Sequence, residues 1–497
     1  MVLGIDLGTT YSVGAYLDEE GTPQIVKNLD GEEMTPSVVM VDGEDVIVGR
    51  TARRNAIIDP ENVCARIKVN MGDKKVLLKQ NEEDYTPEML SHFIVKKIVN
   101  DAAEILNEEI DEVVITVPAY FSDSQRKATK DAVMLSGLNL IGMIDEPTAA
   151  ALYYGNATKI EKGTILVYDF GGGTFDATLL SIEGEDIKIL KKSGIKEAGG
   201  SYFDDNIAEY VMDIIFEKHD IDLRDEEYSD ILQELLINAE ECKKQLGMRQ
   251  KASIVVRVGN IREKVEIERS TFEKMISKMY NRTESVVCSV LDQAGLKPEE
   301  VDKVLLVGGS SQIPYVQEQL KELFGESVSH EIDPHFSVAK GAAIYGGLCK
   351  NKSSMESAFQ DVCAHGIGLV MFKLDSSEQY NKILIEANTP IPTSVEYDGA
   401  TRLANQTAIH LLITEGEFED IDFVEIISEQ DIELPKGLAK NTQVKIRFEI
   451  DRWQLLHVYI KIPQIDLNWE CDINRLSNLT EEQIREMSGL VATKQVY

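Results

Sequence analysis

Two short segments of the sequence place an aspartate directly before a turn rich in glycine and threonine. The first is Asp6-Leu7-Gly8-Thr9-Thr10, and the second runs from Asp169 through Gly171-Gly172-Gly173-Thr174 to Asp176. Glycine lets backbone N–H groups approach phosphate oxygens closely, and threonine hydroxyls add donors. An aspartate at the end of each preceding apolar run supplies the hard oxygens that Mg²⁺ prefers. One such turn alone could be an ordinary tight turn, but two in matching contexts predict a nucleotide-phosphate site.

A third glycine-containing loop follows another apolar run. Gly308-Gly309 precedes Ser310-Ser311, a composition that suits close approach of the backbone to the nucleoside end of a ligand. A simple strand-to-helix turn would have the same composition. The sequence contains no G-x-x-x-x-G-K-[ST] motif, so the predicted site is not of the P-loop type.

The apolar runs that would carry these turns occur in two similar sets within the first 350 residues. Residues 2–6 and 165–169 each lead into a turn and then into alternating residues, as in the start of an antiparallel meander. Residues 110–117 and 301–307 are buried-strand patterns that each lead into a helix. The repetition predicts an α/β fold of two similar lobes that face each other, with residues 200–297 inserted in the second lobe.

The composition changes after residue 350. Residues 351–357 are polar and typical of a linker. Between residues 366 and 475, period-2 patterns such as 443–450 predict a small all-β domain. Thr480 and Gln483 then have the spacing of a capping box, which predicts that a helix begins there.

Composition also limits the expected partners and compartment. The 51 Lys and Arg against 86 Asp and Glu give a net charge of −35, which disfavours broad binding to nucleic acid or to anionic membranes. No apolar run approaches the roughly 20 residues of a membrane span, and the N-terminus lacks the features of a signal peptide. The six cysteines include no C-x-x-C pair. Reduced thiols and a cytoplasmic location are therefore expected.

Several motifs identify a family. They are residues 4–12 (GIDLGTTYS), 116–121 (TVPAYF), 145–152 (DEPTAAAL), 168–176 (YDFGGGTFD) and 306–310 (LVGGS). With these motifs the chain resembles the 70-kilodalton heat-shock chaperones of the DnaK type, within the actin-like ATPase superfamily. The resemblance is dense over residues 3–347. It implies duplicated actin-like (ribonuclease H-like) lobes, ATP or ADP as the bound nucleotide, and Mg²⁺ together with K⁺.

By this resemblance, Lys68 matches the family's catalytic lysine, and Glu146 and Asp176 would orient or deprotonate the attacking water. Asp169 and Thr174 complete the implied catalytic set. Asp6 and Asp169 would hold Mg²⁺ through water. The implied nucleotide-binding residues are Gly8, Thr9, Thr10, Tyr11, Gly171, Gly172, Gly173, Thr174, Gly200, Glu240, Lys243, Lys244, Gly308, Gly309 and Ser310.

The resemblance also implies a division of the chain. Residues 1–350 would form the ATPase domain and residues 351–365 the interdomain linker. Residues 366–475 would form a β-sandwich substrate-binding domain, and residues 476–497 the start of a truncated lid helix.

The sequence departs from the family pattern at positions with known duties. Gln312 stands where the family has an adenine-stacking arginine, and His335, which also fits an ordinary surface histidine, stands where it has an aspartate. Gly142 replaces the arginine that J-domain co-chaperones contact. The linker has Ala358-Phe359-Gln360 in place of a run of leucines, which puts the coupling between nucleotide state and the β domain in question.

The expected function is that of an ATP-dependent chaperone that hydrolyses ATP and binds extended apolar polypeptide segments. Residues 383–385 are either peptide contacts or strand core. A specialised regulator that acts on one dedicated protein partner is the alternative, and the linker and Gly142 favour it. A small-molecule kinase or a filament-forming protein of the superfamily would have no use for the β domain. A nucleotide-exchange factor is an expected partner, whereas a J-domain protein, nucleic acid and a membrane are not.

Overall fold

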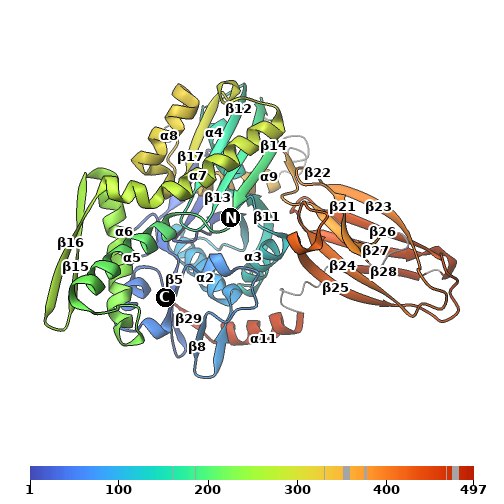
Figure 1. The fold of residues 1–497 in the computed structure, drawn as a ribbon, viewed down its shortest axis with the longest axis horizontal. Coiled ribbons are helices and arrows are strands. Elements are labelled where there is room, and N and C mark those ends of the chain that lie inside the picture. Colours follow the sequence, from blue (N-terminus) through green and yellow to red (C-terminus); the bar gives the residue numbers. More distant parts are fainter. Residues whose placement is uncertain are drawn as a thin grey trace.

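The computed structural model describes residues 1–158, 160–184, 186–329, 331–350, 359–373, 378–465, 467–472 and 481–497. The protein is mixed α/β, with two large sheets built mainly by the first 350 residues and two four-stranded sheets beyond them (Figure 1). We call the parts around the two large sheets the first and second lobes. In the described part of the chain, no helix is both long and apolar enough to cross a membrane.

The sheet of the first lobe positions the first predicted turn. Its strands follow the order β11-β10-β1-β2-β3, and β4 also pairs with β2. β1 is parallel to β10 and antiparallel to β2, so Asp6 lies at the end of β1 where the turn begins. The strands are β1 (Val2–Asp6), β2 (Tyr11–Leu17), β3 (Pro23–Val26), β4 (Thr35–Pro36), β10 (Glu112–Val117) and β11 (Asn139–Asp145).

The sheet of the second lobe positions the second turn in the same manner. β12 is antiparallel to β13 and parallel to β17, and Asp169 pairs with Asp176 across the hairpin. The strand order is β18-β17-β12-β13-β14-β19-β22. The strands are β12 (Lys162–Phe170), β13 (Phe175–Glu183), β14 (Asp186–Ile195), β17 (Lys303–Val307), β18 (Val328–Ser329), β19 (Phe359–Val362) and β22 (Pro390–Ile391).

Two helices, α4 (Glu146–Thr158) and α9 (Ser337–Lys350), join the lobes. α9 packs on β1 and β2, α4 packs on β12, and the two helices contact each other. A Cβ atom on Gly341 of α9 would lie 1.8 Å from the carbonyl oxygen of Ala149 in α4. Glycine therefore allows the two helix backbones to touch.

The remaining helices cover the sheets or form the insertion. α3 begins with a capping box, because the Ser122 and Gln125 side chains each accept the other residue's backbone N–H. The other elements of the lobes are α1 (Arg50–Asn55), α2 (Pro87–Leu106), α3 (Asp123–Leu135), α5 (Gly200–His219), α6 (Ser229–Met248), α7 (Arg269–Ala294), α8 (Pro314–Phe324), β5 (Val38–Asp42), β6 (Asp45–Val48), β7 (Val63–Ala65), β8 (Leu78–Gln80), β9 (Glu83–Tyr85), β15 (Lys251–Val258) and β16 (Ile261–Glu268).

We call residues 366–472 the β module. Val444, Ile446, Phe448 and Ile450 are buried between its two sheets while the residues between them are not, as the period-2 pattern predicts. One sheet contains β20 (Ile367–Phe372), β21 (Gln379–Ile385), β24 (Ala408–Glu415) and β25 (Glu425–Glu433). The other contains β23 (Thr393–Ala400), β26 (Gln443–Ile450), β27 (Leu456–Ile462) and β28 (Leu467–Asp472).

The β module is attached to the lobes through a linker strand. β19 pairs in parallel with β14 at the edge of the second sheet, with Phe359 beside Ile187 and Gln360 beside Lys188. These are backbone hydrogen bonds, so the polar Gln360 does not prevent the linker from docking as a strand. The rest of the predicted linker, residues 351–358 with Ala358, lies outside the described residues.

The C-terminal residues return to the first lobe. Thr480 of the predicted capping box lies outside the described residues, and a helix, α11 (Glu481–Ala492), follows as expected. Val491 of α11 is buried in the core of the first lobe, and β29 (Gln495–Val496) adds in parallel to β6. Lys494 donates to Gly43 O at 2.9 Å and to Glu83 Oε2 at 2.7 Å. We call residues 481–497 the C-terminal strap (Figure 1).

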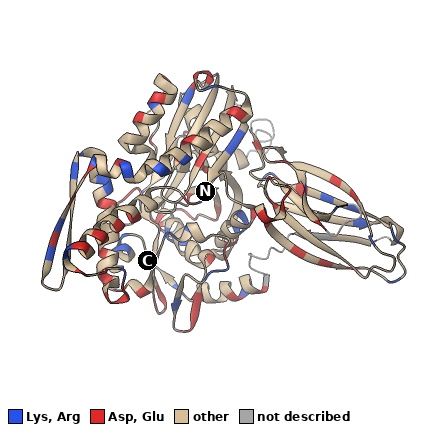
Figure 2. Cartoon of the chain, viewed as in Figure 1, with Lys and Arg blue, Asp and Glu red and all other residues tan. Residues whose placement is uncertain are grey.

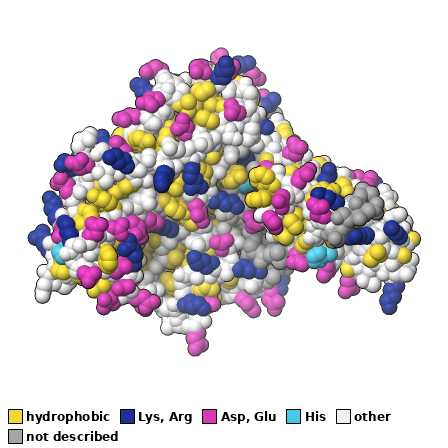
Figure 3. Space-filling view, in the orientation of Figure 1, with side chains coloured by type: hydrophobic (Ala, Val, Ile, Leu, Met, Phe, Trp, Pro, Cys, Tyr) yellow, Lys and Arg dark blue, Asp and Glu magenta, His cyan; other side chains and the backbone are white. Residues whose placement is uncertain are grey.

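Charged side chains are spread over the whole molecule. Acidic and basic residues occur on both lobes and on the β module (Figure 2). On the face shown in Figure 3, acidic, basic and hydrophobic side chains are interspersed. The negative net charge is therefore distributed and not gathered in one segment.

Candidate nucleotide site

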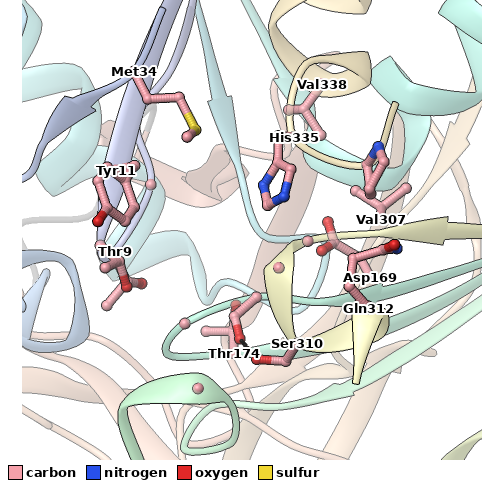
Figure 4. Close-up of a pocket in the computed structure, with 18 of the residues that line it drawn as sticks. Thr9, Tyr11, Met34, Asp169, Thr174, Val307, Ser310, Gln312, His335 and Val338 are labelled. Carbon is pink, nitrogen blue, oxygen red and sulfur yellow. Dashed lines mark hydrogen bonds between the residues drawn. The ribbon is translucent and has the colours of Figure 1, made fainter. Parts of the chain in front are cut away.

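A cavity of about 480 Å³ lies between the lobes, where the ends of β1, β12 and β17 meet (Figure 4). Figure 4 shows Thr9 and Tyr11 facing Asp169, Gln312 and His335 across it. The predicted site residues that line the cavity are Asp6, Gly8, Thr9, Thr10, Tyr11, Lys68, Glu146, Asp169, Gly171, Gly172, Thr174, Gly200, Glu240, Lys243, Lys244, Gly308, Gly309 and Ser310.

Gly173 and Asp176 belong to the second turn but do not line the cavity. Gly173 packs against Thr9 of the facing turn, since a Cβ atom placed on it would lie 2.8 Å from Thr9 Oγ1. Asp176 is fully buried and accepts a hydrogen bond of 2.8 Å from the backbone N–H of Tyr120.

The glycines of the second turn let the two turns and the third loop meet. A Cβ atom on Gly172 would lie 2.2 Å from Thr10 Oγ1, so no larger residue fits there without movement. Gly171 O accepts hydrogen bonds from Ser310 Oγ at 2.7 Å and from the backbone N–H of Gly200 at 3.0 Å. These contacts bring three segments that are distant in sequence to one side of the cavity.

Buried carboxyl groups gather at the end of the cavity near β1 and β12. Burial, together with repulsion from Glu146, raises the pKa of Asp6 to about 7 and the pKa of Asp176 to about 8. The pKa of Asp169 is also raised, first by burial and then by Glu146 and Asp176. Asp169 Oδ2 has no hydrogen-bond partner among the described residues. Ionisation of all three carboxyl groups is therefore disfavoured unless a cation is added at this end of the cavity.

A hydrated divalent cation fits this arrangement. A buried, unpaired carboxylate oxygen beside a second aspartate is suited to bind the water shell that Mg²⁺ keeps. Within the described ranges, no three carboxylate, imidazole or thiolate groups converge as direct ligands of a metal ion. Contact with Mg²⁺ through water therefore stays a prediction for Asp6 and Asp169.

Lys68 supplies positive charge at the same end. It lies in a 3-10 turn, Ile67–Asn70, that follows Arg66 in the left-handed conformation. Its Nζ donates to Glu146 Oε1 at the N-terminus of α4, and both side chains are nearly buried. Arg66 pairs with Asp205 of α5 at 2.7 Å and so ties the turn that carries Lys68 to the second lobe.

The insertion forms the other end of the cavity. Lys243 donates to Gly200 O at 2.7 Å, and Lys244 pairs with Glu240 at 2.9 Å. Gln312 and His335 also line this end. Gln312 donates to Ser311 Oγ at 3.2 Å.

Sequence reasoning missed several residues that line or border the cavity. Arg53 donates to Tyr11 at 2.6 Å and pairs with Glu240, and so bridges two residues that line the cavity from different lobes. Met34, Met248 and Val338 supply apolar lining. None of these residues belongs to a motif, so only folding reveals their position.

The amino-acid sequence matches a known family. The family model described as Hsp70 protein matches residues 2–495. The chain belongs to the Hsp70 family. Its relatives include the chaperone protein DnaK from two strains of Halobacterium salinarum. Each is 33% identical over 493 residues, which cover 98% of this chain and 77% of the relative.

Membership of the Hsp70 family determines the general activity. This Hsp70 protein is an ATP-dependent chaperone and an ATPase, and it binds its nucleotide with Mg²⁺. The predicted family and the predicted chaperone activity are both confirmed. The alternative of a regulator dedicated to one partner is not favoured.

Proposed function

We propose that Mg-ATP binds in the cavity between two duplicated lobes of the actin-like type. The single observation that carries the proposal is that both aspartate–glycine–threonine turns line one cavity. The pairings of β1 with β2 and β10 repeat in those of β12 with β13 and β17. Backbone donors of the turns would hold the phosphates, and Glu240, Lys243, Lys244 and the third loop would hold the adenosine.

In the proposed hydrolysis, Lys68 stabilises charge on the γ-phosphate, and Glu146 holds Lys68 through their ion pair. Glu146 and Asp176 orient the attacking water and accept its proton. Thr174 adds a hydroxyl donor beside the phosphates. Asp6 and Asp169 would hold Mg²⁺ through water, and the ion would supply positive charge beside the phosphates; K⁺ is proposed as a second cation.

We propose the domain boundaries 1–350, 351–365, 366–475 and 476–497, and a cytoplasmic location. A nucleotide-exchange factor is a proposed partner. A J-domain protein is not a proposed partner, because Gly142 occupies the position of the arginine that such proteins contact in the family. A Cβ atom on Gly142 would lie 2.8 Å from Tyr345 and 3.0 Å from Cys349 Sγ, so α9 leaves no space for a larger side chain.

Extended apolar polypeptides are the proposed clients, bound at the end of the β module. Ile385 is buried in the module core and Leu384 packs against it, so residues 383–385 serve mainly as strand core. Phe372 and Leu403 are instead 48% and 63% exposed. The Arg402 guanidinium, in the loop after β23, lies 4.6 Å from the ring centroid of Phe372 at the end of β20. These side chains are the proposed peptide contacts.

The decisive experiment is single-turnover ATP hydrolysis at fixed Mg²⁺ and K⁺, with and without an excess of an extended apolar peptide. Acceleration by the peptide is expected, because the linker strand is docked on the second lobe. Hydrolysis that does not respond to the peptide would contradict the proposed coupling and peptide site, and absence of hydrolysis would contradict the proposed ATP site.

Gln312→Arg is expected to tighten ATP binding. A guanidinium stacked on the adenine would add on the order of 1 kcal/mol, or about fivefold in Kd. Isothermal titration with ATP measures this change. Gln319→Arg, on the same segment but outside the cavity lining, is the matched control. Equal Kd values for Gln312→Arg and the parent would show that the base does not lie beside residue 312.

A further inference from the structure

The charged side chains at the insertion end of the cavity are paired with one another or with nearby protein groups. Glu240 Oε1 lies 2.9 Å from Lys244 Nζ, and Glu240 Oε2 accepts a hydrogen bond from Arg53. Lys243 Nζ donates to Asp204 Oδ2 at 2.8 Å. Charge fixes each of these groups as a donor or as an acceptor. Their positions are therefore set by protein partners.

The other two long polar side chains at this end can both donate and accept. Gln312 carries an amide oxygen and an amide N–H₂ group, and a neutral imidazole such as that of His335 donates from one ring nitrogen and accepts at the other. Gln312 Nε2 lies 3.2 Å from Ser311 Oγ, and Gln317 donates to Gln312 Oε1 at 3.4 Å. These bonds are long, and Gln312 and His335 are both exposed. The amide of Gln312 is therefore free to rotate.

The wall beside these side chains is apolar and leaves space. Met248 is 77% exposed, and a Cβ atom on Gly247 would meet no atom within 4 Å. The Gly247 carbonyl accepts a hydrogen bond of 3.1 Å from Arg269. Methionine is unbranched and adapts its shape to different ligands. The wall therefore offers contact to the face of any purine without a close steric limit.

Adenine and guanine differ at the edge that Gln312 and His335 would contact. Adenine presents an amino donor at C6, whereas guanine presents an oxygen acceptor there. A site rejects one of two such bases when a group of fixed polarity is left unpaired or is repelled by it. A rotating amide and an imidazole that can change its tautomer satisfy either base, and water reaches the exposed side chains to complete the remaining hydrogen bonds.

We propose that the cavity binds and hydrolyses guanosine triphosphate as well as ATP. Water adds to the γ-phosphorus, the bond from this phosphorus to the oxygen shared with the β-phosphate breaks, and GDP, phosphate and a proton are released. Lys68, Glu146 and Asp169 are the same for both substrates, because they lie beside the phosphate turns and not beside the base. This inference rests on the proposed placement of the nucleotide.

The test compares GTP with ATP on the full chain, with Mg²⁺ and K⁺ present. The Kd for GTP, measured by isothermal titration, is expected to lie within about tenfold of the Kd for ATP, and GTP should displace labelled ATP. The single-turnover rates at saturation should agree within about twofold, because the reacting groups do not contact the base. A larger difference in Kd, or GTP that does not displace ATP, would overturn the proposal.

Gln312→Glu tests the physical explanation. A carboxylate accepts from the amino group of adenine and repels the C6 oxygen of guanine, so the ratio of the Kd for GTP to the Kd for ATP should rise at least about tenfold. Gln319→Glu introduces the same charge outside the cavity lining and should leave this ratio unchanged. An unchanged ratio for Gln312→Glu would show that residue 312 does not contact the base edge, and the explanation would fail.

The outcomes separate this inference from the proposed function. If neither triphosphate binds, the proposed nucleotide site fails and this inference fails with it. If ATP binds and is hydrolysed but GTP is not, only this inference fails. Lys68→Ala should remove hydrolysis of both triphosphates. Hydrolysis of GTP that survives Lys68→Ala, when hydrolysis of ATP does not, would arise outside this cavity and would also overturn the inference.

Discussion

Lys68→Ala is expected to lower the single-turnover rate of ATP hydrolysis by at least about a hundredfold, as removal of a preorganised charge at a transferring phosphoryl group does elsewhere. Lys68 is also the cation that partly offsets the raised pKa values of Asp6, Asp169 and Asp176. ATP should still bind, because the glycine turns and the residues of the insertion are unchanged. Rapid-quench hydrolysis and titration with labelled ATP measure the two effects separately.

Lys74→Ala is the matched control, since Lys74 is an exposed lysine shortly after the 3-10 turn that carries Lys68. It should hydrolyse ATP at the parent rate. A parent-like rate for Lys68→Ala would exclude Lys68 from the reaction. Loss of ATP binding together with hydrolysis would instead show that Lys68 holds the ground state, contrary to the proposed role.

Lys192→Met is the second substitution with a large expected effect. Lys192 of β14 is fully buried, with Nζ 2.7 Å from Asp145 Oδ2 and 3.1 Å from Asp361 Oδ1. Arg126 lies 2.7 Å from Asp145 Oδ1, and Gln454 donates to Asp361 Oδ2 at 2.8 Å. This buried cluster joins both lobes, the linker strand and the β module.

The pKa values of the two aspartates of the cluster are shifted in opposite directions. Burial favours a raised pKa for both, but the charges of Arg126 and Lys192 outweigh burial at Asp145 and lower its pKa. The pKa of Asp361 remains raised because its nearby charges compensate less. Removing Lys192 would leave Asp361 buried without an adjacent cation, at a cost of about 3–5 kcal/mol.

Separation of the linker strand and the β module from the lobes (undocking) would relieve that cost, because Asp361 would then return to water. Lys192→Met should therefore shift the protein toward an undocked state, seen as changed Trp453 fluorescence and a larger radius of gyration by small-angle scattering. Trp453 of the β module reports docking, in a Trp469→Phe background, because Lys130 Nζ of α3 lies 5.7 Å from its ring centroid. Lys188→Met, at an exposed lysine of the same strand, should remain docked. Adding Asp361→Asn to Lys192→Met should recover most of the docking, since no buried charge is then left unpaired. A docked Lys192→Met protein would show that the cluster does not hold the interface.

Much of the site was predictable because it consists of local motifs. The aspartate–glycine–threonine turns, the capping box at Ser122 and the alternation in residues 443–450 are determined by backbone chemistry and side-chain period within a few residues. Repetition of the first motif predicted two facing turns. The family, the ATPase activity and most of the cavity lining followed from the same residues.

Other features depended on contacts between distant segments. The polarity of the linker put its coupling to the nucleotide site in question. In the structure β19 pairs through its backbone, and Lys192 compensates the buried Asp361 from another strand. Lys192 and His365 belong to no motif, so their burial and their partners could not be predicted from the residues next to them in the sequence. The return of residues 481–497 to β6 likewise depends on an open strand edge and an apolar surface on the first lobe.

The sequence by itself determined which groups can bind phosphate and a divalent cation, because glycine conformation and carboxylate chemistry are properties of the residues themselves. Only the tertiary structure decided which hydrogen bonds those groups make and which of them line the cavity. Asp176 accepts a hydrogen bond from the backbone of Tyr120 and does not line the cavity, and His365, just before the β module, contacts the same tyrosine. Hydrogen-bond geometry between segments more than 200 residues apart is a consequence of packing, and local composition does not encode it.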